Sequence, residues 1–462
     1  MTRSASLLAG GADTIVARAT AEGRAALAMI RITGAQAISI ARALGAPALG
    51  VSALAPRVAT RVTLRHPITG VRLDDALVTA FFSPHSFTGE DVVELSTHGG
   101  RVVPTLVVAA CVAAGARLAL PGEFARRAVV NGKLDVLQAE AIADLIDART
   151  VAMQRQALVQ LDGGLSRRLL ALRDDVIHLE ALLAYDIDFP EEDDGPIAPA
   201  RITAAAESLI GSLDALLATA PRATLLRDGA LVVIAGPPNA GKSSLFNALL
   251  GEARALVTPI AGTTRDAVDG LLDRAPVPLR FVDTAGLRDT DDTLERLGIE
   301  VSARYLASAH VVLACGATAP EVEAAIAAVA SRTTALTLPV YTKVDLLGSH
   351  EARDAAWCYA SAETGEGLAS LLGRIDVAVA DAAHEGYAED EVVVTRERHQ
   401  RGLREACEEI TRFRDGWGSG ALPATVAAVH LQSARDALSD LVGAIGTEDV
   451  LDRVFAEFCI GK

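Results

Sequence analysis

The stretch GPPNAGKSS at residues 236–244 decides the fold of the central part of this 462-residue chain. It contains the spacing G-x-x-x-x-G-K-[ST] of a phosphate-binding loop (P-loop), in Gly236, Gly241, Lys242 and Ser243. The preceding run ALVVIAG is typical of a buried strand, and the following residues predict a helix. In such a loop, Lys242 reaches the β and γ oxygens of a nucleotide and Ser243 Oγ binds Mg2+. The sequence therefore predicts an α/β nucleotide-binding domain around this loop.

Two downstream segments supply groups for the γ-phosphate and for Mg2+. PIAGTTRD, at residues 259–266, is rich in hydroxyl groups, and its Thr264 is the candidate second Mg2+ ligand. In LRFVDTAGL a predicted strand ends at Asp283, whose carboxylate is placed to hold Mg2+ through water. The N–H group of Gly286 can then reach the γ-phosphate.

Two further segments indicate that the base is guanine. TLPVYTKVDLL reads as a strand followed by Thr342, Lys343 and Asp345, and the Asp345 carboxylate can accept hydrogen bonds from both guanine N–H donors. Adenine does not present that pair of donors. SAETGEGL offers Ser361 and Ala362 for the far side of the base. These segments follow one another in the order that a GTPase requires, so the central domain is predicted to be a guanine-nucleotide switch.

The predicted switch lacks two groups that GTP hydrolysis needs. Leu287 stands where small GTPases carry a glutamine that orients the attacking water, and an apolar side chain cannot do this. The residues alone do not choose among the acids that follow, which are Asp289, Asp291, Asp292 and Glu295. The missing positive charge can come from an arginine of a partner or from a monovalent cation near Asn239 and residues 258–263.

Composition bounds the class of protein. The formal net charge of −16 argues against broad electrostatic binding of nucleic acid, so we expect any RNA contact to be local or supplied by a partner. No apolar run approaches the length of a membrane span, and the N-terminus lacks a signal-peptide pattern. An odd number of widely spaced cysteines indicates neither a disulfide framework nor a zinc site and suits a reducing cytoplasm: Cys111, Cys315, Cys358, Cys407 and Cys459.

Lysine is scarce, because 39 of the 43 basic residues are arginine. Two explanations stand side by side: biased codon usage with random survivors, or retention of lysine where a compact ammonium is needed and a planar guanidinium will not serve. The four lysines are Lys133, Lys242, Lys343 and Lys462.

The pattern along the chain predicts a multidomain α+β and α/β protein. Short β-like runs (14–20, 27–33, 75–82 and 91–97) and one helical stretch near 101–115 indicate an N-terminal α+β module. Helical periodicity then surrounds the alternating strand and helix region, so the α/β domain is expected to be inserted into a helical domain. The expected boundaries are 1–128 for the N-terminal domain, 129–222 for the first helical part, 223–383 for the G domain and 384–462 for the second helical part.

Motifs along the whole chain carry a family resemblance. They are DTIVARAT, SFTGEDVVELSTHGG, PGEFARRAVVNGKLDVLQAEAIADLIDA, DFPEE, GPPNAGKSSLFNAL, IAGTTRD, DTAGLR with ERLGIE, and the terminal FCIGK. With these motifs the chain resembles the bacterial and organellar tRNA-modification GTPases of the MnmE (TrmE) family. The resemblance implies a cytoplasmic homodimer with a folate-binding-like N-terminal domain and a Ras-like P-loop GTPase domain inserted into a helical domain. It also implies an FAD-containing MnmG-like partner, with which a carboxymethylaminomethyl or aminomethyl group is added to C5 of the wobble uridine of tRNA.

The resemblance also implies site residues. A tetrahydrofolate derivative, 5,10-methylenetetrahydrofolate or 5-formyltetrahydrofolate, is expected at Arg31, Glu94, Lys133 and Lys462. Carboxylate and ammonium groups suit the pterin edge and the glutamyl tail of that ligand. Cys459, close to Lys462, is either a participant in the chemistry or a buried structural thiol.

For the G domain, the resemblance implies activation by K+ and by dimerisation. Glu295 is expected to orient the attacking water and to act in catalysis with Lys242. The K+ ligands are expected to be Asn239, Thr258, Ile260 and Thr263. The full set expected to contact the nucleotide and its ions is Asn239, Ala240, Gly241, Lys242, Ser243, Ser244, Thr258, Pro259, Ile260, Ala261, Gly262, Thr263, Thr264, Asp283, Thr284, Ala285, Gly286, Thr342, Lys343, Asp345, Ser361 and Ala362.

One departure from the family pattern concerns base recognition. Thr342 replaces the usual asparagine before Lys343, and a hydroxyl is expected to make fewer hydrogen bonds to the base and the P-loop. Two other functions remain open: a regulatory GTPase of ribosome or RNA assembly without modification chemistry, and an interaction scaffold that dimerises through its N-terminal module. Folate binding would distinguish a tRNA-modification GTPase from both of these alternatives.

Overall fold

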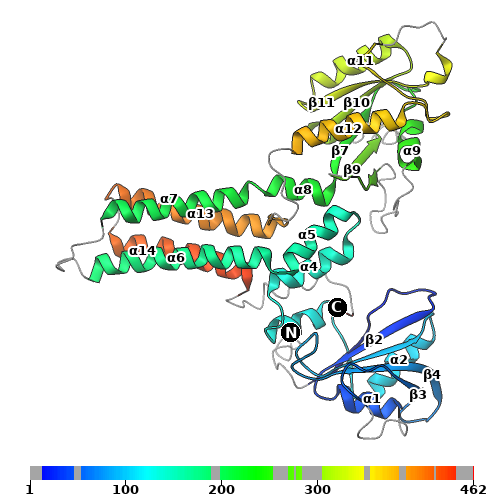
Figure 1. Ribbon diagram of the computed structural model, residues 1–462, viewed down its shortest axis with the longest axis vertical. Helices are drawn as coiled ribbons and strands as arrows, with labels where there is room; N and C mark the ends of the chain where they lie inside the picture. The colour runs from blue at the N-terminus through cyan, green and yellow to red at the C-terminus, as the bar shows by residue number, and fades with distance from the viewer. Residues whose placement is uncertain are drawn as a thin grey trace, which may run out of the picture. The chain divides into compact units, whose positions relative to one another are not determined.

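The computed structural model describes residues 13–45, 54–188, 198–252, 269–274, 277–283, 304–347, 354–383, 392–420, 423–443 and 461. The chain forms two compact units. One contains Met1–Ala143, Leu161–Ile177 and Gln432–Lys462, and the other contains Asp144–Gln160 and His178–Leu431. Many of their elements are labelled in Figure 1.

The N-terminal domain is built on a six-stranded sheet of order β3-β4-β5-β2-β1-β6. The strands pair antiparallel except β6, which runs parallel to β1. The four predicted strands are confirmed, whereas the edge strands β3 and β6 were not predicted, because β3 carries the exposed arginines Arg61 and Arg65 and β6 has only two residues. The strands are β1 (Ile15–Arg18), β2 (Leu27–Thr33), β3 (Thr60–Arg65), β4 (Arg72–Phe81), β5 (Val92–His98) and β6 (Arg117–Leu118).

Alternation along these strands separates two faces of the sheet. Ile30 and Ile32 point into a core shared with α1 (Ala37–Gly45) and α2 (Val103–Ala113). Arg31, between them in sequence, therefore lies on the opposite face. That face also carries Ile15 and Ala17 of β1, which pack with Phe124 of α3 (Glu123–Val130). The sheet thus offers one face to the core and the other to a polar site.

The G domain has a second six-stranded sheet, of order β12-β11-β10-β7-β9-β8, in which only β8 is antiparallel to its neighbour. The predicted strand at 230–236 is confirmed as β7. The elements are β7 (Ala230–Ala235), α9 (Lys242–Glu252), β8 (Asp269–Leu272), β9 (Leu279–Asp283), β10 (Val311–Gly316), α11 (Ala319–Ala330), β11 (Leu336–Tyr341), η1 (Val344–Leu346), β12 (Cys358–Tyr359) and α12 (Leu368–Ala383).

Both faces of this sheet are buried, as its run of apolar residues predicts. Val232 and Ile234 of β7 join a core with residues of α9 and α12, whereas Val233 joins a smaller core on the other face with Val329 of α11. Because five of the strands are parallel, their carboxyl ends meet at one edge of the sheet. Ligands of open α/β sheets bind at that edge, where the strand order reverses on either side of the first strand.

The remaining helices form the helical domain. They are α4 (Val136–Asp147), α5 (Val151–Leu161), α6 (Gly164–Asp188), α7 (Pro199–Leu217), α8 (Ala220–Asp228), α13 (Glu397–Gly418) and α14 (Ala424–Val442). Helix α7, before the G domain in sequence, packs against α13, which follows it (Figure 1). The G domain is therefore an insertion into one helical domain.

The α7–α13 contact also accounts for an apolar stretch. By length and composition, Pro199–Asp228 is apolar enough to cross a membrane. Its buried residues, however, recur at helical spacing and form one stripe: Ile202, Ala206, Leu209, Leu213 and Leu216. The matching stripe on α13 is His399, Leu403, Ala406, Ile410 and Phe413. The two stripes pack against each other, so these apolar side chains of α7 are buried against α13.

Candidate functional site

The P-loop joins β7 to α9 with a backbone that needs glycine. Gly236, Asn239 and Gly241 have φ angles of 152°, 64° and 78°. A Cβ atom at Gly236 would lie 2.2 Å from the carbonyl oxygen of Cys315 on β10, closer than any side chain tolerates. Only glycine fits between the loop and the neighbouring strand at this point. The close approach fixes where the loop leaves the sheet.

Three predicted phosphate and Mg2+ groups meet at the carboxyl end of the sheet. Lys242 is buried, and its Nζ donates to the carbonyl oxygen of Pro237 at 2.7 Å, so the ammonium lies within the curve of the loop. Ser243 Oγ donates to Asp283 Oδ2 at 2.5 Å. A hydroxyl and a carboxylate in contact are the oxygen donors that Mg2+ takes in nucleotide sites. The Ser243–Asp283 pair therefore fits a Mg2+ site.

The predicted base-recognition residues also come together. Asp345 accepts a hydrogen bond from Ser361 Oγ at 2.5 Å, which orients the carboxylate. Ser361 Oγ in turn lies 3.2 Å from the backbone N–H groups of Glu363 and Thr364, which hold it in place. Ala362 follows directly in the chain. This part of the site has a carboxylate facing a short loop, as a guanine slot requires.

Thr342 and Lys343 connect the base-recognition segment to the P-loop. Thr342 Oγ1 lies 2.6 Å from the carbonyl oxygen of Ala240, and Lys343 Nζ donates to that of Asn239 at 2.8 Å. Thr342 thus makes a hydrogen bond to the P-loop, and the expectation that a hydroxyl makes fewer hydrogen bonds than asparagine here stays a prediction. Lys343 adopts φ 56°, which directs the chain from β11 into η1.

Several predicted site residues lie outside the described residues: Thr258, Pro259, Ile260, Ala261, Gly262, Thr263, Thr264, Thr284, Ala285, Gly286, Glu295 and Lys462. Of the expected K+ ligands, the structure thus places only Asn239, on the exposed surface of the P-loop. Among the described residues no group of three or more His, Cys, Asp or Glu side chains converges as a metal site.

In the N-terminal domain, Arg31 and Glu94 face each other across neighbouring strands. They are register partners of β2 and β5, and Arg31 Nε and Nη2 donate to Glu94 Oε1 at 3.0 and 2.7 Å. The guanidinium also lies 5.4 Å from the ring centre of Phe87 and 5.9 Å from that of Phe124. Both rings were missed in the sequence, although they lie in the motifs SFTGED and PGEF. Together these groups make a partly exposed, ring-walled ion pair.

Lys133 and Gly461 lie beside the same region of the sheet. Lys133 Nζ donates to the Pro84 carbonyl oxygen at 3.1 Å, at the start of the loop that carries Phe87. Gly461, with φ 99°, lies so close to the first strand that a Cβ atom would be 2.5 Å from the Arg18 carbonyl oxygen. The neighbouring residue Ala17 pairs with Arg31. The last described residue of the chain is therefore near the Arg31–Glu94 pair.

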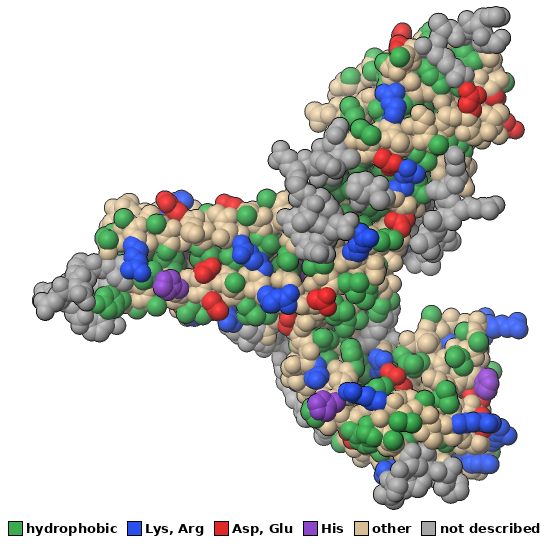
Figure 2. Space-filling model, in the orientation of Figure 1, with side chains coloured by type: hydrophobic (Ala, Val, Ile, Leu, Met, Phe, Trp, Pro, Cys, Tyr) green, Lys and Arg blue, Asp and Glu red, His purple; other side chains and the backbone are tan. Residues whose placement is uncertain are grey.

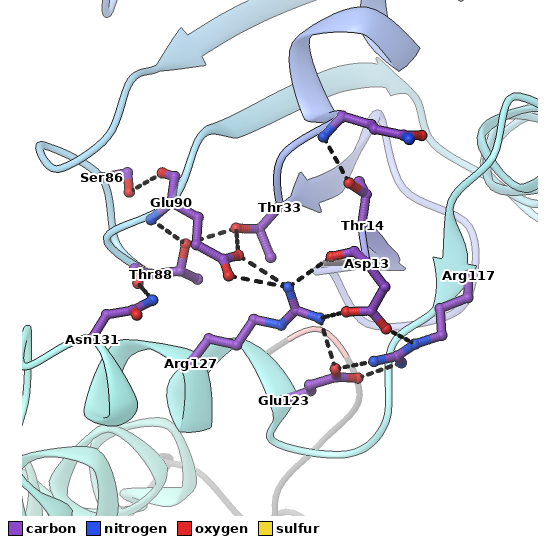
Figure 3. Close-up of polar contacts among 11 residues, drawn as sticks. Asp13, Thr14, Thr33, Ser86, Thr88, Glu90, Arg117, Glu123, Arg127 and Asn131 are labelled. Atoms are coloured by element: carbon purple, nitrogen blue, oxygen red, sulfur yellow. Dashed lines mark hydrogen bonds and ion pairs between the residues drawn. The ribbon is translucent and has the colours of Figure 1, made fainter. Parts of the chain in front are cut away.

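A partly buried ionic network supports this region (Figure 3). Arg127 of α3 donates to Glu90, to Glu123 and to Asp13, at 3.1, 3.1 and 2.8 Å. Arg117 donates to Glu123 and Asp13, and Thr33 Oγ1 donates to Glu90 Oε2 at 2.9 Å. The network ties α3 to the first strand and to the loop of Phe87. The sequence did not reveal it, because its partners are up to 114 residues apart.

Burial alone would raise the pKa of Glu123, but hydrogen bonds from Arg117, Leu120 N–H and Arg127 outweigh it and hold the pKa below its usual value. The pKa of Asp13 is lowered in the same way, with hydrogen bonds from Arg117 and Arg127 overcoming desolvation. Both carboxylates are therefore charged in the folded protein near neutral pH. The network is a saturated set of ion pairs and hydrogen bonds, which suits a rigid support.

Comparison with known proteins matches the whole chain. A family model described as GTP-binding protein TrmE N-terminus matches residues 14–133, and one described as MnmE helical domain matches residues 136–459. The chain belongs to the MnmE family of tRNA modification GTPases. The tRNA modification GTPase MnmE of Azoarcus sp. (strain BH72) is 41% identical over 97% of this chain and 98% of its own length. The MnmE of Syntrophus aciditrophicus (strain SB) is 38% identical over 97% and 99%.

The solved structures that resemble the chain include the G domain of the T. maritima FeoB iron transporter. It is 22% identical and covers 32% of this chain and 98% of its own, with a TM-score of 0.24. Family membership rests on the near full-length relatives, and it agrees with the P-loop, Mg2+ and base groups that the structure brings together in this chain.

The Gly236 contact generates a test of the P-loop. We expect Gly236→Ala to weaken GDP binding by at least about tenfold, because a clash with the backbone of β10 must displace the loop. Titration with a fluorescent GDP analogue measures the loss. Gly251→Ala on α9 is the matched control, since a Cβ atom there meets nothing within 4 Å, and it should bind normally. Unchanged binding by Gly236→Ala would contradict the loop geometry.

The ionic network generates a pH prediction. Because the folded-state pKa of Glu123 is depressed, its stabilisation is present above the unfolded pKa of about 4.5 and is lost as pH falls through the folded-state pKa. Glu123→Gln should lower stability at pH 7 by about 1–3 kcal/mol, the cost of an unsatisfied buried partner. The thermal stabilities of wild type and variant should then converge only below pH 4.5, as pH falls through the folded-state pKa of Glu123. Glu22→Gln, at an exposed position, is the control, and parallel curves for Glu123→Gln and wild type would refute the assignment.

Proposed function

We propose that this MnmE-family GTPase hydrolyses GTP to drive the modification of C5 of the wobble uridine in tRNA. It works as a cytoplasmic homodimer with an FAD-containing MnmG-like partner, and the group added is carboxymethylaminomethyl or aminomethyl. The observation that carries the proposal is the combination, in one chain, of a complete described P-loop with a second polar site in the N-terminal domain. The near full-length relatives named tRNA modification GTPase MnmE support it.

The G domain supplies the groups for binding and hydrolysis. Lys242 neutralises phosphate charge that develops during hydrolysis, and Ser243 with Asp283 holds Mg2+ against the phosphates. Asp345, oriented by Ser361, selects guanine. Leu287 cannot orient water, and the resemblance to the MnmE family leads us to assign that role to Glu295. The same resemblance assigns the missing cation to K+ bound by Asn239, Thr258, Ile260 and Thr263. Dimerisation of G domains is proposed to activate hydrolysis at this site.

The N-terminal site is proposed to bind a tetrahydrofolate derivative, 5,10-methylenetetrahydrofolate or 5-formyltetrahydrofolate. Glu94 would face the donors of the pterin edge, with the rings of Phe87 and Phe124 beside it. The cations of Lys133 and Lys462 would face the glutamyl carboxylates, and the position of Gly461 beside the first strand supports this for Lys462. The bound folate would supply the one-carbon unit of the modification.

Contact with tRNA is proposed to be local and shared with the MnmG-like partner. The chain has a formal net charge of −16, which opposes broad phosphate binding. On the face shown in Figure 2, Lys and Arg side chains of the described residues lie dispersed among Asp and Glu. A basic partner surface would therefore provide most of the phosphate contacts.

Deletion of the gene tests the function as a whole. We expect nucleoside analysis of tRNA from the deletion strain to show loss of the C5-modified wobble uridine and its return on complementation. A regulatory GTPase of ribosome assembly, the competing function, would leave the modified nucleoside in place and change the ribosomal subunit profile instead. The ring-walled Arg31–Glu94 pair favours modification, because a switch alone has no use for it.

Folate binding gives a prediction at the N-terminal site. We expect Glu94→Gln to weaken binding of 5-formyltetrahydrofolate by about tenfold or more, because a charged hydrogen-bond acceptor is lost. Equilibrium dialysis with the full-length protein measures the change. Asp75→Asn, which removes the partner of Arg61 and Arg72 on β4 of the same sheet, is the matched control and should bind normally. Equal binding by Glu94→Gln and wild type would remove Glu94 from the site.

The hydrolytic machinery predicts a cation dependence. GTP turnover should be at least about tenfold faster in KCl than in NaCl at equal ionic strength, because a correctly sized cation replaces the missing positive charge. Glu295→Gln should lower turnover in KCl by about a hundredfold or more while GDP affinity stays unchanged. Phosphate release measures turnover. Equal rates in the two salts, or full activity of Glu295→Gln, would exclude this mechanism.

A further inference from the structure

Thr342 occupies a buried position between three strand ends of the G domain. It follows β11, and its backbone N–H donates to the Gly316 carbonyl oxygen at the end of β10, at 2.8 Å. Its hydroxyl oxygen lies 2.6 Å from the carbonyl oxygen of Ala240 in the P-loop and 3.0 Å from that of Gly316. The residue is only 3% exposed. The hydroxyl is thus enclosed by main-chain groups of the P-loop and β10.

The chemistry of a hydroxyl limits what Thr342 can do from this position. Both neighbours are carbonyl oxygens, which only accept, so the hydroxyl must be the donor, and it has one proton. Gly316 O already receives the Thr342 backbone N–H, and Ala240 O is the nearer acceptor. The hydroxyl therefore donates its proton to Ala240 O of the P-loop, and it has no second proton to donate to a nucleotide base.

We propose that Thr342 is a positioning residue that secures the P-loop and does not read the N7 edge of guanine. An amide at this position would have two N–H donors, one for the P-loop and one for N7, whereas threonine can provide only the first. Guanine selection then rests on the carboxylate of Asp345, held by Ser361. This inference rests on the proposed guanine-nucleotide site.

The neighbouring lysine supports a mechanical role for the segment. Lys343 Nζ donates to Asn239 O at 2.8 Å, next to the carbonyl that Thr342 holds. Two consecutive side chains thus secure two consecutive P-loop carbonyls, at a point where Asn239 has a left-handed φ of 64°. Such a loop gains from external hydrogen bonds, because its backbone is not held by a helix or sheet ladder. Binding of phosphate and of base is coupled through this contact.

Nucleotide analogues test the inference in the full-length protein. Affinities for GDP, 7-deaza-GDP and ADP are measured by competition against a fluorescent GDP analogue in Mg2+. Wild type should bind 7-deaza-GDP within about twofold of GDP, because no side-chain hydrogen bond to N7 is lost. A loss of about fivefold or more on removing N7 would overturn the inference. ADP binding as tight as GDP binding would instead refute the guanine site, whatever the N7 result.

Three substitutions distinguish a hydrogen bond from Thr342 to the P-loop from a hydrogen bond to guanine N7. Thr342→Ser keeps the hydroxyl and should bind GDP within about threefold of wild type. Thr342→Val keeps the shape and should weaken GDP and 7-deaza-GDP equally, by about tenfold, since the P-loop loses its donor. Thr342→Asn should bind GDP about two- to tenfold better than 7-deaza-GDP, because the second N–H now meets N7.

Two outcomes for Thr342→Val would count against the proposal. GDP binding by Thr342→Val at the wild-type level would show that the hydroxyl does not secure the P-loop. A drop for GDP in Thr342→Val that 7-deaza-GDP does not share would show that Thr342 reads N7 in the native protein. Thermal unfolding of each variant shows whether its G domain is folded. If one variant does not fold, the ratio of the GDP and 7-deaza-GDP affinities of the wild-type protein still tests the proposal.

Discussion

The close contact between Gly236 and the backbone of Cys315 is the constraint on which the nucleotide site depends. It lets the loop after β7 pass directly over the end of β10, and this is possible only because β7 and β10 are parallel neighbours. The carboxyl ends of β9, β11 and β12 lie at the same edge, so the sheet places Asp283, Thr342 and Ser361 beside the P-loop. Replacing that glycine would therefore disturb phosphate, Mg2+ and base groups together.

The two polar sites share one feature: polar groups that are removed from water are held in place by hydrogen bonds or ion pairs. Carbonyl oxygens of the P-loop are held by Thr342 and Lys343, and in the N-terminal domain Arg127 satisfies carboxylates from three separate segments. Breaking one partner of such a set leaves a buried group unpaired, which costs more than the intact bond contributes. Rigidity of this kind is what a site for phosphates or a folate needs, because the ligand then meets groups already in place.

The scarcity of lysine acquires a structural meaning. Each of the three described lysines donates to a main-chain carbonyl oxygen of a loop at a candidate site: Lys133 to Pro84, Lys242 to Pro237 and Lys343 to Asn239. A compact ammonium on a flexible stem reaches such an acceptor from a distance and can release it to an incoming anion. The planar fork of arginine is instead used in the permanent pairs, such as Arg127 with its carboxylates. This distribution favours selection for ammonium chemistry over random survival.

The sequence by itself determined the P-loop, the order of the GTPase segments, the insertion of an α/β domain between helices and the identity of most candidate residues, because each depends on local spacing or on a motif. The tertiary structure decided what depends on distant pairing. It brought Phe87 and Phe124 to Arg31, assembled the Arg127 network from five segments, and showed that the Thr342 hydroxyl reaches the P-loop. The edge strands β3 and β6 also emerged only there. These features escape a linear reading because a side chain's partners are set by sheet register and strand order, which no single stretch of sequence encodes.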